Sequence, residues 1–326
     1  MVRRRALSAW AACLSLGIGA VPPLRGASPA RIAWITGARG DPQSPFLGAF
    51  RLGLAELGRV EERDFRLEVY WGDDAAGRLD GLVAKMLGDR PDVIVTQGPI
   101  VFNVQRSGTP LPVLFAYSGD PVEARLVESL ARPGRNLSGL SMMALELVGK
   151  RLEALADAVP GLRRVALVSN PGHAGERGEL AASQAAASRL GLDIRYLPFQ
   201  GDAGMDGALA DVLRSGCQAI VVFPDAGMMR RSERFAEFGR QNRVPAASGW
   251  AEFARRGNLL SYGPNVRQVN RRLASYVDRV LKGAAPAELP VELPTVIEHV
   301  INLRSARAMG LGVPGAALLR ADELIE

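Results

Sequence analysis

Short apolar runs alternate with amphipathic stretches along almost the entire chain, and this alternation constrains the fold more than any other feature. The apolar runs have the length of strands, and the stretches between them repeat apolar residues at helical spacing. Predicted strands cover residues 31–36, 65–70, 93–96, 113–117, 137–142, 164–169, 193–197, 219–223, 244–247, 259–262 and 296–303. Predicted helices cover residues 46–57, 75–87, 145–158, 174–190, 205–214, 228–240, 266–281 and 304–309.

Strands that alternate with helices in this way predict an α/β fold, in which parallel sheets carry helices on both faces. The cycle ends once with the helix at residues 145–158 and starts again with the strand at residues 164–169. We therefore expect two doubly wound, Rossmann-like lobes. Such sheets bind ligands at the carboxyl ends of their strands. Two lobes that face each other across a cleft would thus place both sets of loops on one ligand.

The first 27 residues have the organisation of an export signal. Arg3, Arg4 and Arg5 precede an uncharged apolar segment at residues 6–21, and small residues at positions 26–28 offer a cleavage site. We predict a signal peptide over residues 1–27 and a periplasmic location for the rest of the chain. The alternative is an uncleaved membrane anchor.

The positive charge of the chain lies partly in that first segment. The chain has 40 basic and 34 acidic residues, and the first 30 residues hold four of the basic ones and no acid. The remaining 36 basic and 34 acidic residues nearly balance. Nucleic-acid binding requires a clustered basic face, so we expect no nucleic-acid partner.

Residue types that mark enzymes and metal sites are scarce. Cys13 lies in the predicted signal and Cys217 lies beside an apolar run, so we expect Cys217 to be a buried thiol. His173 and His299 are far apart, and no neighbour has the spacing of a zinc ligand. We expect His299 to be structural. The sequence has no G-x-S-x-G motif and no phosphate-binding P-loop. We therefore expect no enzyme activity, no cofactor and no metal.

One glycine-rich stretch, Gly-Asp-Ala-Gly-Met-Asp-Gly at residues 201–207, lacks the spacing of a nucleotide-binding motif. We expect it to form a loop that precedes a helix.

Three blocks of sequence carry a family resemblance. Residues 119–155 contain Gly-Asp-Pro-Val, Leu-Ala-Arg-Pro-Gly, Asn-Leu-Ser-Gly-Leu-Ser and Glu-Leu-x-Gly-Lys-Arg-Leu-Glu. Residues 261–265 read Ser-Tyr-Gly-Pro-Asn before a long amphipathic stretch, and residues 297–326 form the third block. Together they resemble the ABC transporter substrate-binding family that includes the tryptophan/tyrosine-binding receptors.

The resemblance implies the fold of a type I periplasmic binding protein, in which three crossovers join the lobes. We place the crossovers near residues 140–143, 262–265 and 291–295. The implied N-terminal lobe comprises residues 28–140 and 265–295, and the implied C-terminal lobe comprises residues 141–264 and 296–326. The resemblance also implies a monomeric receptor that closes around a small molecule and docks onto ABC permease subunits.

Candidate ligand-binding residues of the N-terminal lobe follow the predicted strands. Thr36 ends the first strand, and Phe46 opens the helix after the next loop. Thr96, Gln97 and Gly98 lie where the third strand meets a helix, whose free N–H groups would suit a ligand carboxylate. The alternative for this segment is an ordinary strand-to-helix turn.

Tyr117 and Asp120 follow the fourth strand. Asp120 would pair with a ligand ammonium, or it would cap the helix that Pro121 begins. Tyr117 would stack on a ligand ring or pack in the core.

The equivalent loops of the C-terminal lobe supply Asn170, Asp225 and Ser248. Asp225 is a second candidate ammonium partner, with helix capping as its alternative. Ser141 lies beside the first crossover and would serve the ligand or the hinge, whereas His173 would contact ligand or remain solvated. Separate recognition of an ammonium and a carboxylate would fit an amino acid or a related zwitterion.

Two other functions fit the same sequence. The same fold serves as a sensory module that signals to a membrane receptor, and a cleft hydrolase would use Asp120 and Asp225 as paired carboxylates. The sequence does not distinguish a transport receptor from a sensor.

Overall fold

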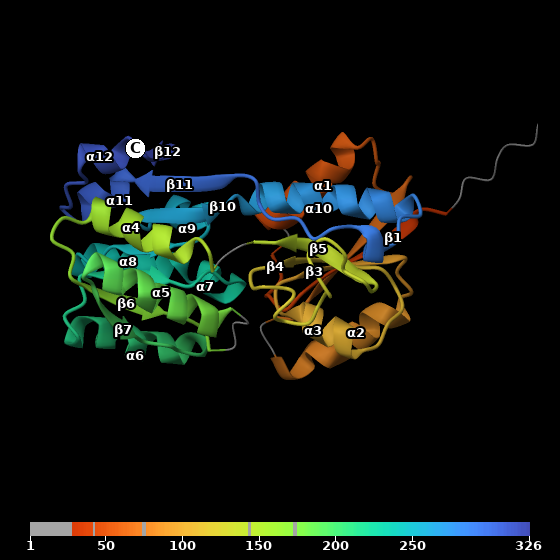
Figure 1. The fold of residues 1–326 in the computed structure, drawn as a ribbon, viewed down its shortest axis with the longest axis horizontal. Coiled ribbons are helices and arrows are strands. Elements are labelled where there is room, and N and C mark those ends of the chain that lie inside the picture. The colour runs from red at the N-terminus through yellow and green to blue at the C-terminus, as the bar shows by residue number, and fades with distance from the viewer. Residues whose placement is uncertain (1–27, 42, 74–75, 143–144, 172–174) are drawn as a thin grey trace, which may run out of the picture.

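The computed structural model describes residues 28–41, 43–73, 76–142, 145–171 and 175–326. Two lobes lie side by side along the long axis of the molecule, and each is built around its own sheet (Figure 1). The predicted α/β class with two doubly wound lobes is therefore confirmed. The predicted signal peptide, residues 1–27, lies outside the described residues.

The sheet of the first lobe has five parallel strands in the order β2-β1-β3-β4-β5. Its strands are β1 (Ala30–Thr36), β2 (Phe65–Trp71), β3 (Val93–Gln97), β4 (Val113–Tyr117) and β5 (Leu137–Ser141). Its helices are α1 (Pro45–Glu56), α2 (Leu79–Gly88), α3 (Ile100–Arg106) and, much later in the chain, α10 (Val266–Leu281), with 3-10 turns η1 (Ala76–Arg78) and η2 (Pro286–Glu288).

Alternate residues of β1 show how this lobe is layered. Ile32 and Trp34 belong to the core beneath α1 and α10, whereas Ala33 and Ile35 belong to the core beneath α2 and α3. Successive side chains of a strand point to opposite faces, so helices on both faces require a strand that is apolar throughout. This is why residues 31–36 form an almost unbroken apolar run.

The sheet of the second lobe has seven strands in the order β12-β11-β10-β9-β8-β6-β7. Its strands are β6 (Arg164–Val168), β7 (Asp193–Tyr196), β8 (Ala219–Val222), β9 (Ala246–Ser248), β10 (Leu260–Pro264), β11 (Ile297–Asn302) and β12 (Glu323–Ile325). All neighbouring strands are parallel except β10 and β11, which are antiparallel.

Helices cover both faces of this second sheet as well (Figure 1). They are α4 (Val148–Ala158), α5 (Glu176–Leu190), α6 (Gly201–Arg214), α7 (Ala226–Arg230), α8 (Ser232–Asn242), α9 (Ala251–Arg255), α11 (Leu303–Ala308) and α12 (Gly315–Leu318). Leu152 of α4 packs on the same face as Val165, whereas Phe235 of α8 packs on the opposite face with Ala166.

The chain passes between the two sheets after β5, after β10 and before β11. Backbone hydrogen bonds tie these segments together. The Ser141 N–H donates to the Glu292 carbonyl at 3.0 Å, and the Asn265 N–H donates to the Val296 carbonyl at 3.0 Å. The three connections therefore form one hydrogen-bonded hinge.

Two local predictions are wrong. Residues 201–207 are not a loop, because α6 begins at Gly201 and contains all three glycines. Residues 228–240 are not one helix, because Arg231 separates α7 from α8 and Asp225 caps the first of them. Cys217 is a buried thiol, as expected.

No helix among the described residues is long and apolar enough to cross a membrane.

His299 gives the fold an expected pH dependence. His299 is a buried residue of β11, 5% exposed, with Nδ1 3.1 Å from the Arg320 carbonyl, and burial lowers its pKa below the usual 6.5. The unfolded chain then binds the proton more tightly, so stability is lost as the pH falls below about 6.5. The variant His299→Asn keeps a donor for the Arg320 carbonyl but has no group that titrates in this range. In urea unfolding, its free energy of unfolding should therefore fall less between pH 7 and pH 5 than that of the wild type. An equal loss in both proteins would contradict this assignment.

Candidate functional site

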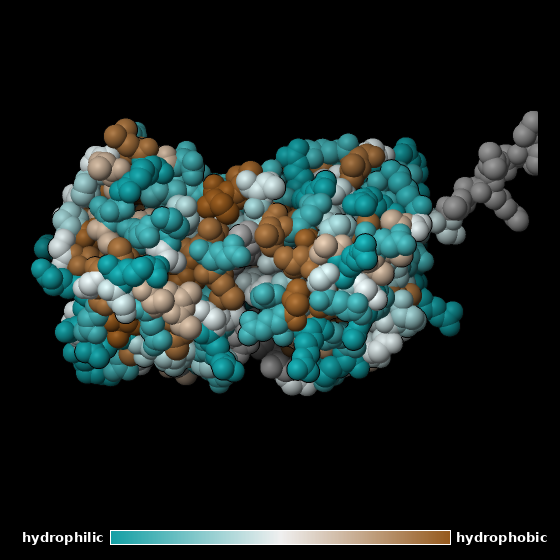
Figure 2. All heavy atoms as spheres, viewed as in Figure 1, coloured by the Kyte–Doolittle hydropathy of each residue, from teal (hydrophilic) through white to brown (hydrophobic). Residues whose placement is uncertain are grey.

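A cavity of about 570 Å³ lies between the two lobes, within the size range of small-molecule sites. The loops that line it follow strands β1, β3, β4 and β5 of the first lobe and β6, β8 and β9 of the second. On the face drawn in Figure 2, hydrophobic residues gather where the lobes meet, between outer surfaces that are mostly hydrophilic. The cavity thus occupies the position expected for the ligand of two facing α/β sheets.

Several sequence-predicted site residues line this cavity from both lobes. They are Thr36, Phe46, Gln97 and Gly98 in the first lobe, and Asn170 and Asp225 in the second. His173 lies outside the described residues. These residues share one feature, a position at or just beyond the carboxyl end of a strand or at the start of the next helix.

Other predicted residues do not line the cavity. The Thr96 side chain is fully buried within the sheet. Tyr117 is also buried, packs edge-on against Phe102 with 5.7 Å between ring centroids, and has its pKa raised to about 12 by burial. The structure therefore supports the packing alternative for Tyr117 rather than stacking on a ligand.

Asp120, Ser141 and Ser248 are likewise held by the protein itself. The exposed Asp120 Oδ1 accepts hydrogen bonds from the Val122 and Glu123 N–H groups, as a capping residue does. It caps a turn, because the helix predicted to begin at Pro121 is absent from the structure. The Ser248 hydroxyl donates to the Val222 carbonyl at 2.8 Å, and the Ser141 hydroxyl lies 3.4 Å from the Gly119 carbonyl. The Ser141 backbone N–H also donates to Glu292 in the hinge, which agrees with the hinge alternative for this residue.

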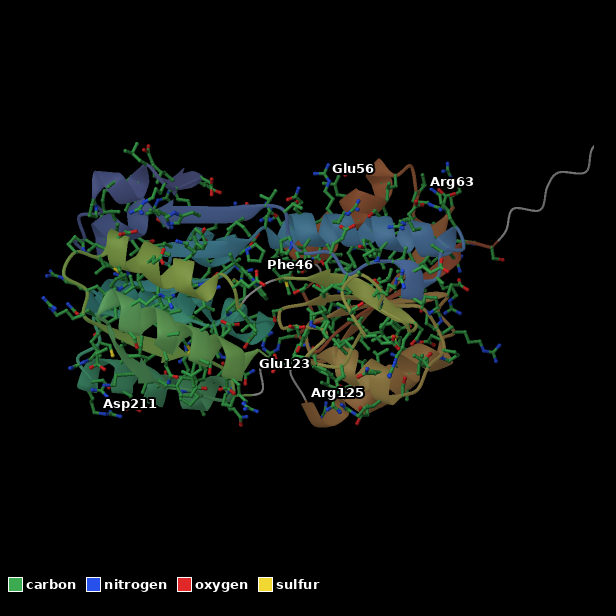
Figure 3. All side chains as sticks on the ribbon, in the orientation of Figure 1. Phe46, Glu56, Arg63, Glu123, Arg125 and Asp211 are labelled. Carbon is green, nitrogen blue, oxygen red and sulfur yellow. The ribbon has the colours of Figure 1, made fainter. Side chains whose placement is uncertain are left out.

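Aromatic side chains that sequence reasoning missed form much of the wall. Trp34, Trp71 and Trp250 all line the cavity, and the described residues contain no other tryptophan. The Phe46 ring lies almost perpendicular to the Trp250 ring, with centroids 5.6 Å apart, so this contact joins the lobes. Figure 3 shows Phe46 at the junction of the lobes, whereas Glu56 and Arg63 lie on the outer part of the first lobe.

The charged residues of the lining balance in number. The acids Asp41, Asp225 and Glu252 are matched by the arginines Arg39, Arg230 and Arg256 among the described residues that line the cavity. A site without net charge suits a ligand without net charge, including one that carries a positive and a negative group together.

Two polar atoms in this lining are buried without a hydrogen-bond partner among the described residues. One is Asp225 Oδ2, whose sister oxygen Oδ1 accepts the Met228 N–H at 2.8 Å and caps α7. The other is Gln97 Nε2, in the first lobe. Buried polar groups are nearly always hydrogen-bonded. We therefore expect a bound ligand to hydrogen-bond to the acceptor Asp225 Oδ2 of the second lobe and to the donor Gln97 Nε2 of the first lobe.

A metal centre has no support in the described residues, in which no group of three histidine, cysteine or acidic side chains could hold an ion.

Comparison with known proteins decides the family. Residues 47–325 match the family described as "ABC transporter substrate binding protein". The chain belongs to this family. A substrate-binding protein carries its ligand without converting it, so the expectation of a non-enzymatic protein is confirmed by the family. The protein is thus the solute-binding component of an ABC transporter and binds a small molecule.

Individual relatives are distant but extend over most of the chain. A tyrosine-binding protein of Clostridioides difficile (strain R20291) is 19% identical over 278 residues, covering 84% of this chain and 80% of the relative. This substrate-binding protein also resembles an ABC domain from Streptococcus pneumonia in complex with L-Trp, with a TM-score of 0.83, 20% identity and coverage of 91% and 100%. A conserved domain protein of Vibrio cholerae gives a TM-score of 0.82, 24% identity and coverage of 90% and 99%. These structural likenesses establish the fold.

Proposed function

We propose that this substrate-binding protein binds an amino acid, or a closely related zwitterion, in the cavity between its lobes. The observation that carries the proposal is the pair of unpartnered buried atoms, Asp225 Oδ2 and Gln97 Nε2. A ligand ammonium would donate to the Asp225 carboxylate, and a ligand carboxylate would accept from the Gln97 amide. The two groups come from opposite lobes, so a zwitterion that satisfies both would favour the closed arrangement.

The side chain of this ligand would contact aromatic surface. Trp34, Trp71, Phe46 and Trp250 line the cavity, and aromatic walls favour stacked or edge-to-face contacts with another ring. The tyrosine-binding relative and the similar structure in complex with L-Trp both bind an aromatic amino acid, which supports the same ligand class. We therefore rank aromatic amino acids first among the zwitterions to be tested.

The transport role completes the proposal. A predicted signal peptide over residues 1–27 would export the chain to the periplasm, where it would act as a monomer. The lobes, comprising residues 28–140 with 265–295 and residues 141–264 with 296–326, would close about the three crossovers. The closed form would then dock onto permease subunits. Ligand contacts with both lobes supply the differential affinity that such closure requires.

A ligand screen by thermal unfolding tests this proposal. Protein purified after expression of the full chain would be heated with amino acids, nucleosides, sugars and small carboxylates. A ligand at 100 times its Kd stabilises the folded protein by about 2.7 kcal/mol, so the true class should raise Tm clearly. We expect a rise with amino acids, largest for those with aromatic side chains. A rise with sugars or nucleosides alone would reject the zwitterion assignment.

A further inference from the structure

Glu252 belongs to the cavity and is also bound to the hinge. It lies in α9, two residues after Trp250, its side chain is only 7% exposed, and it lines the cavity. The Arg267 Nε donates to Glu252 Oε1 at 2.6 Å. Glu252, which lines the cavity, is thus held by a short, charge-assisted hydrogen bond from Arg267, which does not line it.

The two partners of this bond belong to different lobes. The helix α9 packs on β9, β10 and β11 of the second sheet. The helix α10, which begins one residue before Arg267, packs on α1 and on β3, β4 and β5 of the first sheet. Any rotation of one lobe against the other therefore acts on the Glu252–Arg267 ion pair.

Further polar contacts close a ring around the start of α10. Arg255 lies 3.4 Å from Glu252 and 3.7 Å from Glu298, measured between side-chain nitrogen and oxygen atoms. Asn265 donates from Nδ2 to Glu298 Oε1 at 2.8 Å and caps α10 by accepting the Gln268 N–H. We name Glu252, Arg255, Asn265, Arg267 and Glu298 the hinge network.

We propose that the hinge network is an electrostatic tie between the cavity wall and α10, and that Arg267 is a positioning residue for ligand binding although it does not line the cavity. The tie favours the closed arrangement in which Phe46 meets Trp250. The apparent affinity of a receptor falls in proportion to the population of its binding-competent form. Loss of the tie should therefore weaken binding without removing any ligand contact. This inference rests on the closure mechanism of the proposed function.

The helix α10 supplies a matched control. The Arg267 side chain is 53% exposed, and the Arg271 side chain, one turn later, is 51% exposed. Arg271 pairs with Glu56 of α1, so that its ion pair lies within the first lobe. Arg267→Gln and Arg271→Gln each remove one positive charge from the same helix, but only the first removes a contact between lobes.

The solvent accessibility of the tryptophan side chains reports how far the lobes are separated in the ligand-free protein. All tryptophans of the described residues line the cavity, so acrylamide quenching of their fluorescence should rise as the lobes separate. The experiment uses protein from expression of the full chain, unfolded and refolded to release bound cargo. Calorimetry with L-tyrosine and L-tryptophan measures affinity on the same samples.

Arg267→Gln should lower the closed-to-open ratio by about three- to fivefold, the upper range for a partly exposed ion pair. Quenching of the ligand-free protein should rise, and affinity should fall in proportion to the closed fraction, by up to the same factor, whereas Arg271→Gln should match the wild type in both. Rescue of both readouts by Arg267→Lys would add support, because lysine restores the charge.

Equal quenching of ligand-free Arg267→Gln and ligand-free wild type would overturn the tie. A lower Tm of Arg267→Gln with unchanged quenching and affinity would also overturn it, because a merely structural role gives that result. Failure of the proposed ligand class is a separate observation, namely no heat with either amino acid in the wild type. The quenching comparison still decides the tie in that case.

Discussion

Asp225→Asn should weaken binding of the amino-acid ligand by about 100-fold, equivalent to about 2.7 kcal/mol. Asp225 Oδ1 caps α7 through the Met228 N–H, and asparagine preserves that cap. The substitution replaces only the charge and the unpartnered Oδ2 that would accept the ligand ammonium. Calorimetric titration with the amino acid that gives the largest thermal shift measures the effect, and unfolding of the ligand-free variant should remain close to wild type.

Asp120→Asn is the matched control for this variant. Asp120 also follows a strand and caps the next segment, but it is exposed and lies outside the cavity lining. Its affinity should stay within about twofold of wild type, the usual limit for a surface substitution. If the two variants lost affinity equally, Asp225 would not be the ammonium partner and the cleft geometry would need a different ligand class.

Arg151→Met should destabilise the protein by about 3–5 kcal/mol, the usual cost of leaving one partner of a buried ion pair uncompensated. The Arg151 and Glu179 side chains are fully buried, with Arg151 Nη1 3.6 Å from Glu179 Oε2. Burial lowers the pKa of the Arg151 guanidinium, and the Glu179 charge opposes that shift. Arg151 also donates from Nε to the Tyr262 carbonyl of β10 at 3.3 Å. Urea unfolding at pH 7 gives the free energy of unfolding.

The double variant Arg151→Met with Glu179→Leu should recover most of that loss, because an apolar pair replaces a buried ion pair at little cost. Unfolding measurements on all four members of the cycle separate the pair energy from effects of side-chain volume. A loss below about 1 kcal/mol in Arg151→Met, or no recovery in the double variant, would show that the ion pair is not what stabilises this site.

Sequence reasoning predicted the site well where it depended on chain position alone. Thr36 and Gln97 end parallel strands, and Asn170 follows one. They line the cavity because the carboxyl ends of parallel strands share one edge of each sheet. It predicted poorly where side-chain direction mattered. Thr96 and Ser248 also lie at the carboxyl ends of strands, but their side chains point into the protein.

The aromatic wall shows a second kind of limit. Trp34 lies two residues before Thr36 on β1, and both line the cavity because alternate strand residues share a face. That signal was present in the sequence but equally fitted a core residue, since helices cover both faces of the sheet. The Phe46–Trp250 contact had no local signal, because its partners lie far apart in the chain and in different lobes.

The sequence by itself determined the two α/β lobes and the loops from which a site would be built. These features follow from hydrophobic periodicity, which is a local property of strands and helices. Only the tertiary structure decided which loop residues meet across the cleft. Asp120 and Asp225 occupy equivalent positions after a strand, yet Asp225 lines the cavity and Asp120 does not. The difference arises because the hinge hydrogen bonds and the packing of α10 on the first lobe set the relative orientation of the lobes, and such long-range contacts leave no periodic trace in the sequence.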